Sequence, residues 1–492
     1  MDICRRQFSA WVLAGLAGRV LAAGPRSKLL VLVLLEQFRP DVLESLIPQF
    51  GSAGFRRLLE KSAYFPDCRH LASTFSSSAI ATLATGTWPA QHGIVADRWF
   101  DRASRKPVLA SDEALLATTL AAQAARDASS RVFVVSMDQA QARLFAGTRR
   151  ARVFWMNQRG EFVTGSDWPD WLTDFNRVKP VENLHDAPWM ALAARPGAPP
   201  LRTLRFDPDK PEQFLTLYKS SPFGQEAQFA FLGELITRER LGQGEGLDFI
   251  CLLAGSSALL GYETGGFSPL MEQLMLKLDL HLQYLLDTLA KSPGENAFDL
   301  ALVGAHGAPP APEENAYARM AVNGEALAQA IEKSLAAGAG SHVEKYLYPF
   351  LYLDANAFRD PEPARLAAAR AALQNAAVAD YYTAGGAAST RDEWQRRFRN
   401  SFHPRRSGDV MLSYRPEYVE DYGKGRGISY GSLYNYDVSV PLFLYGPHFR
   451  AGSFGSPVES VDVAPTLAHV MGVAAPSSAT GRILGEALSG GD

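Results

Sequence analysis

Cysteine is scarce in this sequence, and neither sign of charge predominates. Only three of the 492 residues are cysteine, which excludes a disulfide framework, although a single bond between Cys68 and Cys251 remains open. Cys251 lies in the apolar run Phe249–Leu253, which indicates a buried position. The formal net charge of −3 gives no indication that the partner is a nucleic acid or an anionic membrane surface.

Long internal apolar runs, internal repeats and low-complexity segments are also absent. No transmembrane segment is therefore expected in the mature chain. The N-terminus carries the pattern of an export signal: Arg5-Arg6-Gln7-Phe8, an apolar run over residues 10–18, and small residues near Leu21-Ala22-Ala23. Residues 1–23 are predicted to be a twin-arginine-like signal peptide, which implies a periplasmic or secreted protein. An ordinary Sec signal or a fortuitous basic start is the alternative.

Each of two apolar runs is followed, at its carboxyl end, by a side chain that can bind a metal or transfer a proton. Residues 28–35 are continuously apolar, as expected of a central parallel strand buried on both faces, and Glu36 follows them. Residues 298–303 form a second such strand, shortly before His306. Open α/β sheets place ligand sites at the carboxyl ends of their strands, so Glu36 and His306 are candidate site residues.

Helical and strand-like patterns alternate along the rest of the chain. The alternation predicts an α/β fold with a doubly wound, mostly parallel sheet flanked by helices. One domain is expected over residues 28–490, with inserted peripheral segments at about 160–215 and 315–400. The expected helices are Arg57–Ser62, Gln225–Arg240, Leu270–Leu289, Gly324–Ala337, Pro363–Ala379 and Val461–Gly472. The other expected strands are Arg131–Ser136, Arg152–Met156, Leu247–Ala254, Val410–Tyr414 and Pro441–Tyr445, the last two in the core.

A run of small residues after Thr74-Phe75 predicts a short helix closed by Gly86. Its first turn would contain Ser76, Ser77 and Ser78. A helix N-terminus favours an anion, and a hydroxyl there is well placed for nucleophilic attack on a phosphate or acyl group. Serine is also simply a good residue to begin a helix, so the pattern alone leaves both interpretations open.

Seven segments, in order along the chain, resemble the alkaline phosphatase superfamily. The branch is the type I phosphodiesterase/nucleotide pyrophosphatase-like one, which includes single-domain periplasmic alkaline phosphatases. The segments are Phe38–Asp41, Ala84–Ile94, Ser221–Gly224, Ser401–Pro404, Arg406–Val410, Val440–Gly446 and Asp462–Leu467.

The resemblance implies a two-zinc hydrolase of phosphate monoesters or diesters, with a Thr or Ser nucleophile at the position of Ser76. This chain departs from the ligand pattern at nearly every position: where the family has Asp or His, it has Glu36, Ala258, Tyr262, Ala305 and Tyr430, and only His306 matches. Asp97 stands where the family has a substrate-binding Asn. Met137-Asp138-Gln139 stands where some members have a Lys and an Arg.

These replacements remove most of the metal-binding groups. At one zinc site, Ala258, Tyr262 and Tyr430 replace the carboxylate and the imidazoles that the resemblance implies, and a neutral phenol is a poor zinc ligand. The other would keep Glu36 and His306, so we expect no zinc, or at most one at that remnant. Phosphoryl transfer depends on stabilising negative charge, whereas the remaining carboxylates would repel a phosphate dianion.

Three functional interpretations follow. The first is an exported pseudoenzyme that binds an unidentified ligand or partner, with Asp97, Tyr262 and Tyr430 as candidate pocket residues. The alternative is a phosphate-ester hydrolase that uses Ser76 as nucleophile, with one metal or with His306 as general base. In a third, ligands come from elsewhere, for example from His403 or Asp437, although structural roles account for both residues.

Overall fold

The computed structural model describes residues 27–178, 181–310, 320–335, 342–388, 392–416, 418–422 and 428–490. The predicted signal peptide, residues 1–23, lies outside these ranges. Within them, none of the helices combines the length and the apolar character needed to cross a bilayer.

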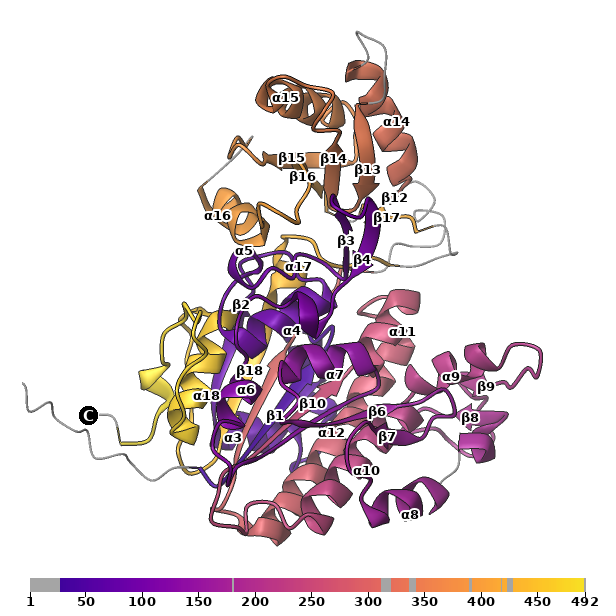
Figure 1. Cartoon of the computed structure of the whole chain (residues 1–492). Coiled ribbons are helices and arrows are strands. Elements are labelled where there is room, and N and C mark those ends of the chain that lie inside the picture. Colours follow the sequence, from indigo (N-terminus) through magenta and orange to yellow (C-terminus); the bar gives the residue numbers. More distant parts are fainter. Residues whose placement is uncertain are drawn as a thin grey trace, which may run out of the picture.

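One large sheet forms the centre of the molecule (Figure 1). Five neighbouring strands run parallel, and antiparallel pairs join β18 (Ser439–Tyr445) to β11 and β2, and β7 (Phe162–Thr164) to β6. The parallel strands are, in spatial order, β11 (Asp299–Gly304), β1 (Leu29–Leu35), β10 (Asp248–Ala254), β5 (Arg131–Ser136) and β6 (Arg152–Met156). Beyond β18 follow β2 (Ser62–Arg69) and β19 (Gly452–Ser453), with β20 (Val458–Glu459) also paired to β2. The predicted mostly parallel α/β sheet is confirmed.

Alternate side chains of β1 divide the interior into two cores. Leu30 and Leu32 belong to one hydrophobic cluster and Val31 and Val33 to the other, and all four are fully buried. Helices cover both faces, as a doubly wound sheet requires. The first core contains α4 (Ser76–Thr85), α6 (Leu120–Ala124), α7 (Gln139–Ala146) and α18 (Val463–Met471). The second contains α2 (Pro40–Leu46), α3 (Phe55–Lys61), α10 (Pro222–Arg238) and α12 (Pro269–Leu289).

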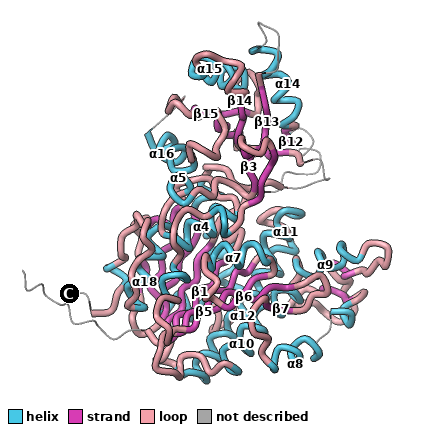
Figure 2. Tube along the Cα trace, in the orientation of Figure 1, coloured by secondary structure: helices cyan, strands magenta, loops and turns pink. Residues whose placement is uncertain are grey.

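A smaller lobe stands at the top of the molecule in Figures 1 and 2 and has its own sheet and core. Its strands are β13 (Val343–Leu347), β14 (Phe350–Leu353), β16 (Val410–Tyr414) and β15 (Val378–Thr383). Helices α14 (Gly324–Leu335) and α15 (Pro361–Ala372) pack on it, and α16 (Asp392–Ser401) lies below them. The hairpin β3 (Arg98–Asp101) and β4 (Lys106–Leu109) reaches this lobe from the core.

A second group of short elements extends from the β7 edge of the sheet, at the right in Figure 1. It consists of α8 (Asp170–Val178), the short helix η3 (Val181–Leu184), the paired strands β8 (Ala187–Trp189) and β9 (Arg202–Leu204), and α9 (Pro211–Lys219). These elements pack beside α10 through residues of the second core, such as Leu172 and Trp189.

Two predictions about the lobe are wrong. The helix expected over 363–379 ends at Ala372, and Val378 begins strand β15, because the segment Val378–Thr383 holds β-branched and aromatic residues that suit a sheet. The strand Val410–Tyr414 does not return to the central core. It pairs with β14 and β15 in the lobe. Cys68 and Cys251 are buried on different strands and are not bonded to each other.

Gly86→Ala tests the backbone that ends the Ser76-bearing helix. Gly86 follows α4 with φ of +66°, and a Cβ there would lie 3.1 Å from the Cβ of Ala479. We expect the substitution to lower the free energy of unfolding, measured by urea denaturation, by about 1–2 kcal/mol, because the left-handed conformation costs an L-residue that much. Gly244→Ala is the matched control, since a Cβ there meets no atom within 4 Å. Equal losses in the two variants would contradict the expectation.

Candidate functional site

Ser76 is the first residue of α4, as the sequence predicts. The preceding residue, Phe75, is extended with ψ of 146°, so the chain turns sharply into the helix at Ser76. Ser78 stabilises this turn, because its hydroxyl lies 2.9 Å from the carbonyl oxygens of both Ser73 and Phe75. The Ser76 hydroxyl is left to face the carboxyl ends of the central strands.

Glu36 and His306 meet at the Ser76 hydroxyl. Strands β1 and β11 are adjacent and parallel, and their register pairs Leu35 with Gly304, so the residues that follow emerge at the same edge. The Oγ of Ser76 lies 2.8 Å from Oε2 of Glu36 and 3.2 Å from Nε2 of His306. All three side chains are at least 95% buried. The structure therefore brings together the three residues that the sequence placed on separate elements.

The tautomer of His306 follows from its second nitrogen. Nδ1 lies 2.7 Å from the carbonyl oxygen of Gly307, which only accepts hydrogen bonds, so Nδ1 carries a proton. In the neutral ring Nε2 is then an acceptor facing Ser76. Burial alone would lower the pKa of His306, but the neighbouring carboxylate of Glu36 outweighs it and raises that pKa above its ordinary value. In the charged ring, Nε2 faces Oε2 of Glu36 at 3.7 Å.

Tyr430 completes the surroundings of the Ser76 hydroxyl. Its phenol oxygen lies 3.0 Å from Oγ of Ser76, and its ring stacks on His306 with centroids 4.4 Å apart. Gly431 allows this placement, because it has φ of +100° and a Cβ there would lie 2.7 Å from the ring of Phe75. Burial raises the pKa of Tyr430 well above its usual range, so the phenol stays protonated.

Asp97 accepts a backbone hydrogen bond from the first turn of α4. Its Oδ1 accepts a hydrogen bond from the backbone N–H of Ser77 at 2.8 Å. Burial raises the pKa of Asp97, and the N–H of Ser77 opposes that rise. The N-terminus of the helix, where an anion would otherwise bind, already has a carboxylate from the same chain.

Two polar residues at the site were not predicted from the sequence. Gln141, on the first turn of α7, donates from Nε2 to Oε1 of Glu36 at 3.0 Å. Its helix is capped by Asp138, whose Oδ1 accepts from the N–H of Gln141, and that capping pattern is the signal that would have placed Gln141 on the first turn. Gln37 adopts a left-handed conformation, with φ of +52°. Its buried Oε1 has no hydrogen-bond partner among the described residues.

The positions where the family resemblance implies further metal ligands hold no such groups. Ala258 and Tyr262 lie four residues apart on α11 (Ser256–Thr264), and Ala305 is fully buried directly after β11. A backbone hydrogen bond of 2.7 Å ties the carbonyl of Tyr262 to the N–H of Ile428, two residues before Tyr430. Among the residues that the structure describes, no group of three or more His, Cys, Asp or Glu side chains could hold a metal ion.

His403 and Asp437 do not reach the Ser76 hydroxyl. Nδ1 of His403 accepts the N–H of Arg405 at 3.3 Å, within its own turn. Asp437 is fully buried, accepts the N–H of Ser432 at 2.8 Å, and has a pKa that burial raises to about 6. Its backbone carbonyl also accepts the N–H of Gly307 at 2.7 Å. Asp437 therefore supports the two loops that carry Tyr430 and His306.

Comparisons with known proteins agree on one family. The family model described as type I phosphodiesterase/nucleotide pyrophosphatase matches residues 30–432. The chain is 24% identical to alkaline phosphatase PhoV of Synechococcus elongatus, over 94% of this chain and 93% of PhoV. It is also 24% identical to alkaline phosphatase PafA of Elizabethkingia meningoseptica, over 97% of each chain.

Solved structures support the same fold. The crystal structure of wild-type PafA matches with a TM-score of 0.80 and 20% identity, covering 95% of this chain and 100% of that chain. A murine ectonucleotide pyrophosphatase/phosphodiesterase 5 matches with a TM-score of 0.57 and 15% identity, covering 94% of this chain and 100% of that chain.

The interaction between Glu36 and His306 should make stability depend on pH. Because the folded-state pKa of His306 is raised, the stabilisation is fully present below the unfolded-state pKa of about 6.5 and is lost as the pH rises through the folded-state pKa. Glu36→Gln should therefore lower the free energy of unfolding more at about pH 5.5 than at about pH 9, as measured by urea denaturation.

His306→Gln supplies the control for this measurement. In the His306→Gln background, the cost of Glu36→Gln should no longer differ between the two pH values. If the cost is already independent of pH with His306 present, the inferred interaction is absent.

Proposed function

Because this chain belongs to the type I phosphodiesterase/nucleotide pyrophosphatase family, we propose that it keeps the fold without the two-metal hydrolysis of phosphate esters, and binds a ligand or protein partner instead. The observation that carries the proposal is the set of groups around the Ser76 hydroxyl. Glu36, His306 and Tyr430 contact it, so one carboxylate and one imidazole are the only good metal ligands there among the described residues.

The residues present do not fit the metals that the family resemblance implies. A protein zinc site uses three or four carboxylate, imidazole or thiolate ligands, and two such sites need about twice that number. Here the methyl groups of Ala258 and Ala305 and the phenols of Tyr262 and Tyr430 stand at the matching positions. The remaining pair, Glu36 and His306, already hydrogen-bonds to Ser76.

The charge of the site also disfavours a phosphate ester. Catalysis of phosphoryl transfer depends on positive groups that stabilise developing negative charge. Among the described residues, no lysine or arginine pairs with Glu36 or Asp97, and the side chains nearest the Glu36 carboxylate are the Ser76 hydroxyl, the Gln141 amide and the His306 imidazole. The helix N-terminus is used by Asp97, so a phosphate dianion would meet carboxylates where it needs cations.

A specific geometry supports a second candidate function, metal-free hydrolysis by Ser76. The Nδ1–H of His306 is held by Gly307, and Nε2 lies 3.2 Å from Oγ of Ser76. In the neutral ring, this nitrogen can accept the serine proton and act as a general base. Glu36 and Tyr430 compete for the same hydroxyl, which is why binding without hydrolysis is the main proposal.

The two candidates separate in one set of assays. We expect wild-type protein purified with added zinc to retain fewer than two zinc ions per chain. We also expect no hydrolysis of 4-nitrophenyl phosphate or bis(4-nitrophenyl) phosphate, with or without zinc, because the ligands and cations are missing. Zinc-independent hydrolysis that Ser76→Ala abolishes would support the second candidate, and two bound zinc ions with zinc-dependent hydrolysis would contradict both.

A variant with restored ligands is the positive control for zinc binding. Ala258→Asp, Tyr262→His, Ala305→Asp and Tyr430→His together return carboxylates and imidazoles to the four positions. This variant should bind more zinc than the wild type when measured by metal analysis of the folded protein, which shows that the fold can hold the metal when the ligands are present.

We also propose that the protein is exported. The support is the sequence of residues 1–23, with paired arginines, an apolar run and small residues before the folded domain. When the full chain is expressed in a bacterium with a twin-arginine export system, we expect it in the periplasmic fraction with its mature N-terminus near residue 24. Recovery only from the cytoplasm with residues 1–23 intact would contradict export.

A further inference from the structure

A buried carboxyl group connects the lobe to the segment that carries Tyr430. Glu420 ends the short strand β17 (Val419–Glu420), which pairs with β12 (Ala321–Val322) at the base of the lobe (Figure 1). Glu420 is 6% exposed, and within the described part of the chain it forms no ion pair with a lysine, arginine or histidine. Its carboxyl group is therefore enclosed without a paired cation.

Neutral hydrogen-bond donors of the lobe surround this carboxyl group. The hydroxyl of Tyr414, on β16, donates to Oε2 of Glu420 at 2.7 Å, and the hydroxyl of Tyr346, on β13, hydrogen-bonds in turn to that of Tyr414. The backbone N–H of Gly324, at the start of α14, donates to the carboxyl group as well. A Cβ at Gly324 would overlap Oε1 of Glu420, so glycine is needed there unless the carboxyl group moves.

The backbone of Glu420 holds the segment that covers Ser76. Its N–H donates to Oγ of Ser429 at 2.9 Å. The next residue, Tyr430, places its phenol oxygen 3.0 Å from Oγ of Ser76. Because Ser76 is itself 4% exposed, a ligand reaches its hydroxyl only if a covering group moves, and Tyr430 is one such group.

Aromatic contacts form a second connection between Glu420 and Ser76. The ring of Tyr414 stacks on that of Tyr348 with centroids 4.7 Å apart, and Tyr348 meets Phe75 edge-on, directly before Ser76. Glu420 is thus linked, through two different chains of contacts, to the residue that covers the Ser76 hydroxyl and to the turn that positions it. A change at Glu420 can therefore reach the site from two sides.

The enclosed carboxyl group keeps its proton up to near-neutral pH. Burial raises the pKa of Glu420 from 4.5 to about 7, and the hydrogen bond from Tyr414 opposes that rise. The charge of Asp421 adds to the rise, whereas the N–H of Gly324 and the guanidinium of Arg98, on β3, oppose it. Burial also raises the pKa of the surrounding phenols, which therefore stay neutral in this range: Tyr346, Tyr348, Tyr414 and Tyr422.

Opening of this enclosure releases a proton at intermediate pH. An exposed carboxyl group ionises with a pKa of 4.5, whereas the pKa of the enclosed Glu420 is about 7. The enclosed arrangement is therefore most stable below pH 4.5, and it loses stability as the pH rises from there to about 7. Above that pH the loss is complete, because Glu420 is then ionised in both arrangements.

We propose that Glu420 is a pH-sensitive latch: when protonated it holds Tyr430 over the Ser76 hydroxyl, and when ionised it releases Tyr430 and opens the site. An ionised carboxylate gains hydration by leaving its enclosure, and leaving breaks the hydrogen bonds to Tyr414 and Ser429. The latch would regulate entry to the Ser76 site, and in that respect it rests on the proposed function. Its test uses no ligand, so it can fail while the proposed function stands.

Amide hydrogen exchange of the whole protein, followed by mass spectrometry from about pH 5 to 8.5, tests the latch. Rates are corrected for the intrinsic effect of pH on exchange. The N–H of Asp421, bonded to the carbonyl of Val322 at 2.9 Å, reports on the latch. The N–H of Ile428, bonded to the carbonyl of Tyr262 at 2.7 Å, reports on the segment of Tyr430. We expect the protection of both to fall by at least about tenfold up to about pH 7 and then to level off.

Variants assign the pH dependence to Glu420. Glu420→Gln has the shape of the protonated form and cannot ionise, so its protection should not fall with pH. Glu325→Gln removes an exposed carboxylate from the first turn of α14, and as the matched control it should keep the wild-type profile. Tyr414→Phe removes a donor to the ionised form, so protection should level off at a higher pH than in the wild type. This variant also decides the matter if Glu420→Gln does not fold.

Three results would overturn the proposal. One is protection that does not change with pH in the wild type. Another is a fall at Ile428 that persists in Glu420→Gln, because another group, such as His306, would then drive the opening. The third is a fall confined to Asp421, because Glu420 would then ionise without moving the segment of Tyr430.

Discussion

The candidate site depends on the parallel pairing of β1 with β11. Both strands are buried along their whole length, and their register leaves Leu35 opposite Gly304 at the end of the ladder. Backbone hydrogen bonds and burial on both faces hold that register, because a slip of one residue would turn every apolar side chain toward the wrong core. Glu36 and His306 are therefore held on either side of the point where α4 begins.

The polar groups at this point hydrogen-bond mainly to one another. The Ser76 hydroxyl interacts with a carboxylate, an imidazole and a phenol. The backbone N–H of Ser77, in the first turn of the helix, donates to the carboxylate of Asp97. In a hydrolase of phosphate esters these groups would be directed at substrate and metal. Here they are directed at one another, and the raised pKa of His306 expresses the negative character of its neighbours. This arrangement is the basis of the proposal that the chain keeps the fold without the hydrolysis, since function resides in a few side chains on a common scaffold.

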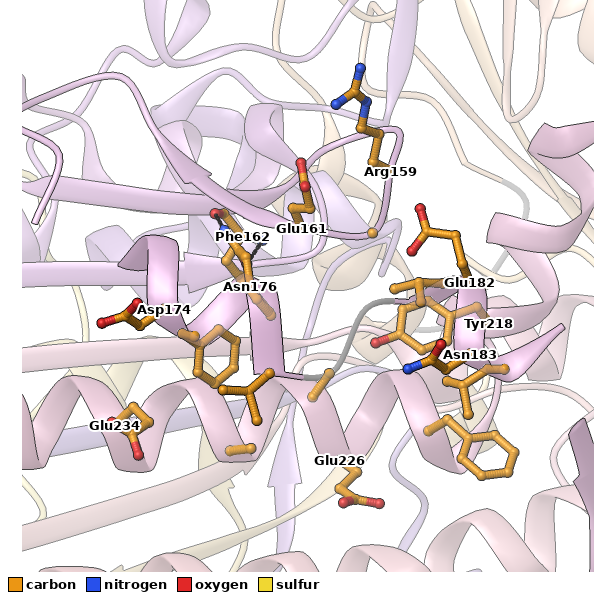
Figure 3. Close-up of a pocket in the computed structure, with 18 of the residues that line it drawn as sticks. Arg159, Glu161, Phe162, Asp174, Asn176, Glu182, Asn183, Tyr218, Glu226 and Glu234 are labelled. Atoms are coloured by element: carbon orange, nitrogen blue, oxygen red, sulfur yellow. Dashed lines mark hydrogen bonds between the residues drawn. The ribbon is translucent and has the colours of Figure 1, made fainter. Parts of the chain in front are cut away.

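The peripheral parts of the chain give this scaffold its individual features. The lobe touches the site through Tyr348, whose ring meets Phe75 edge-on with centroids 6.1 Å apart, directly before Ser76. The elements between β7 and α10 line a cavity together with aromatic residues of the second core, such as Phe162 (Figure 3). Both parts are insertions between core elements, where loops and additions are tolerated because the core hydrogen bonds do not pass through them.

The sequence alone determined the class of the fold, the buried central strands and the helix that begins at Ser76 and ends just before Gly86, because apolar periodicity and a C-terminal glycine are local signals. The family resemblance added a prediction that most metal-ligand positions carry other residues, and that prediction awaits the zinc-binding assay. Only the tertiary structure decided that Ser76, Glu36, His306 and Tyr430 meet, since their separations along the chain reach several hundred residues and no local signal encodes a distance. The contact of Gln141 with Glu36 and the true place of Val410–Tyr414 in the lobe were likewise set by packing, because an isolated strand or amide is compatible with many neighbours.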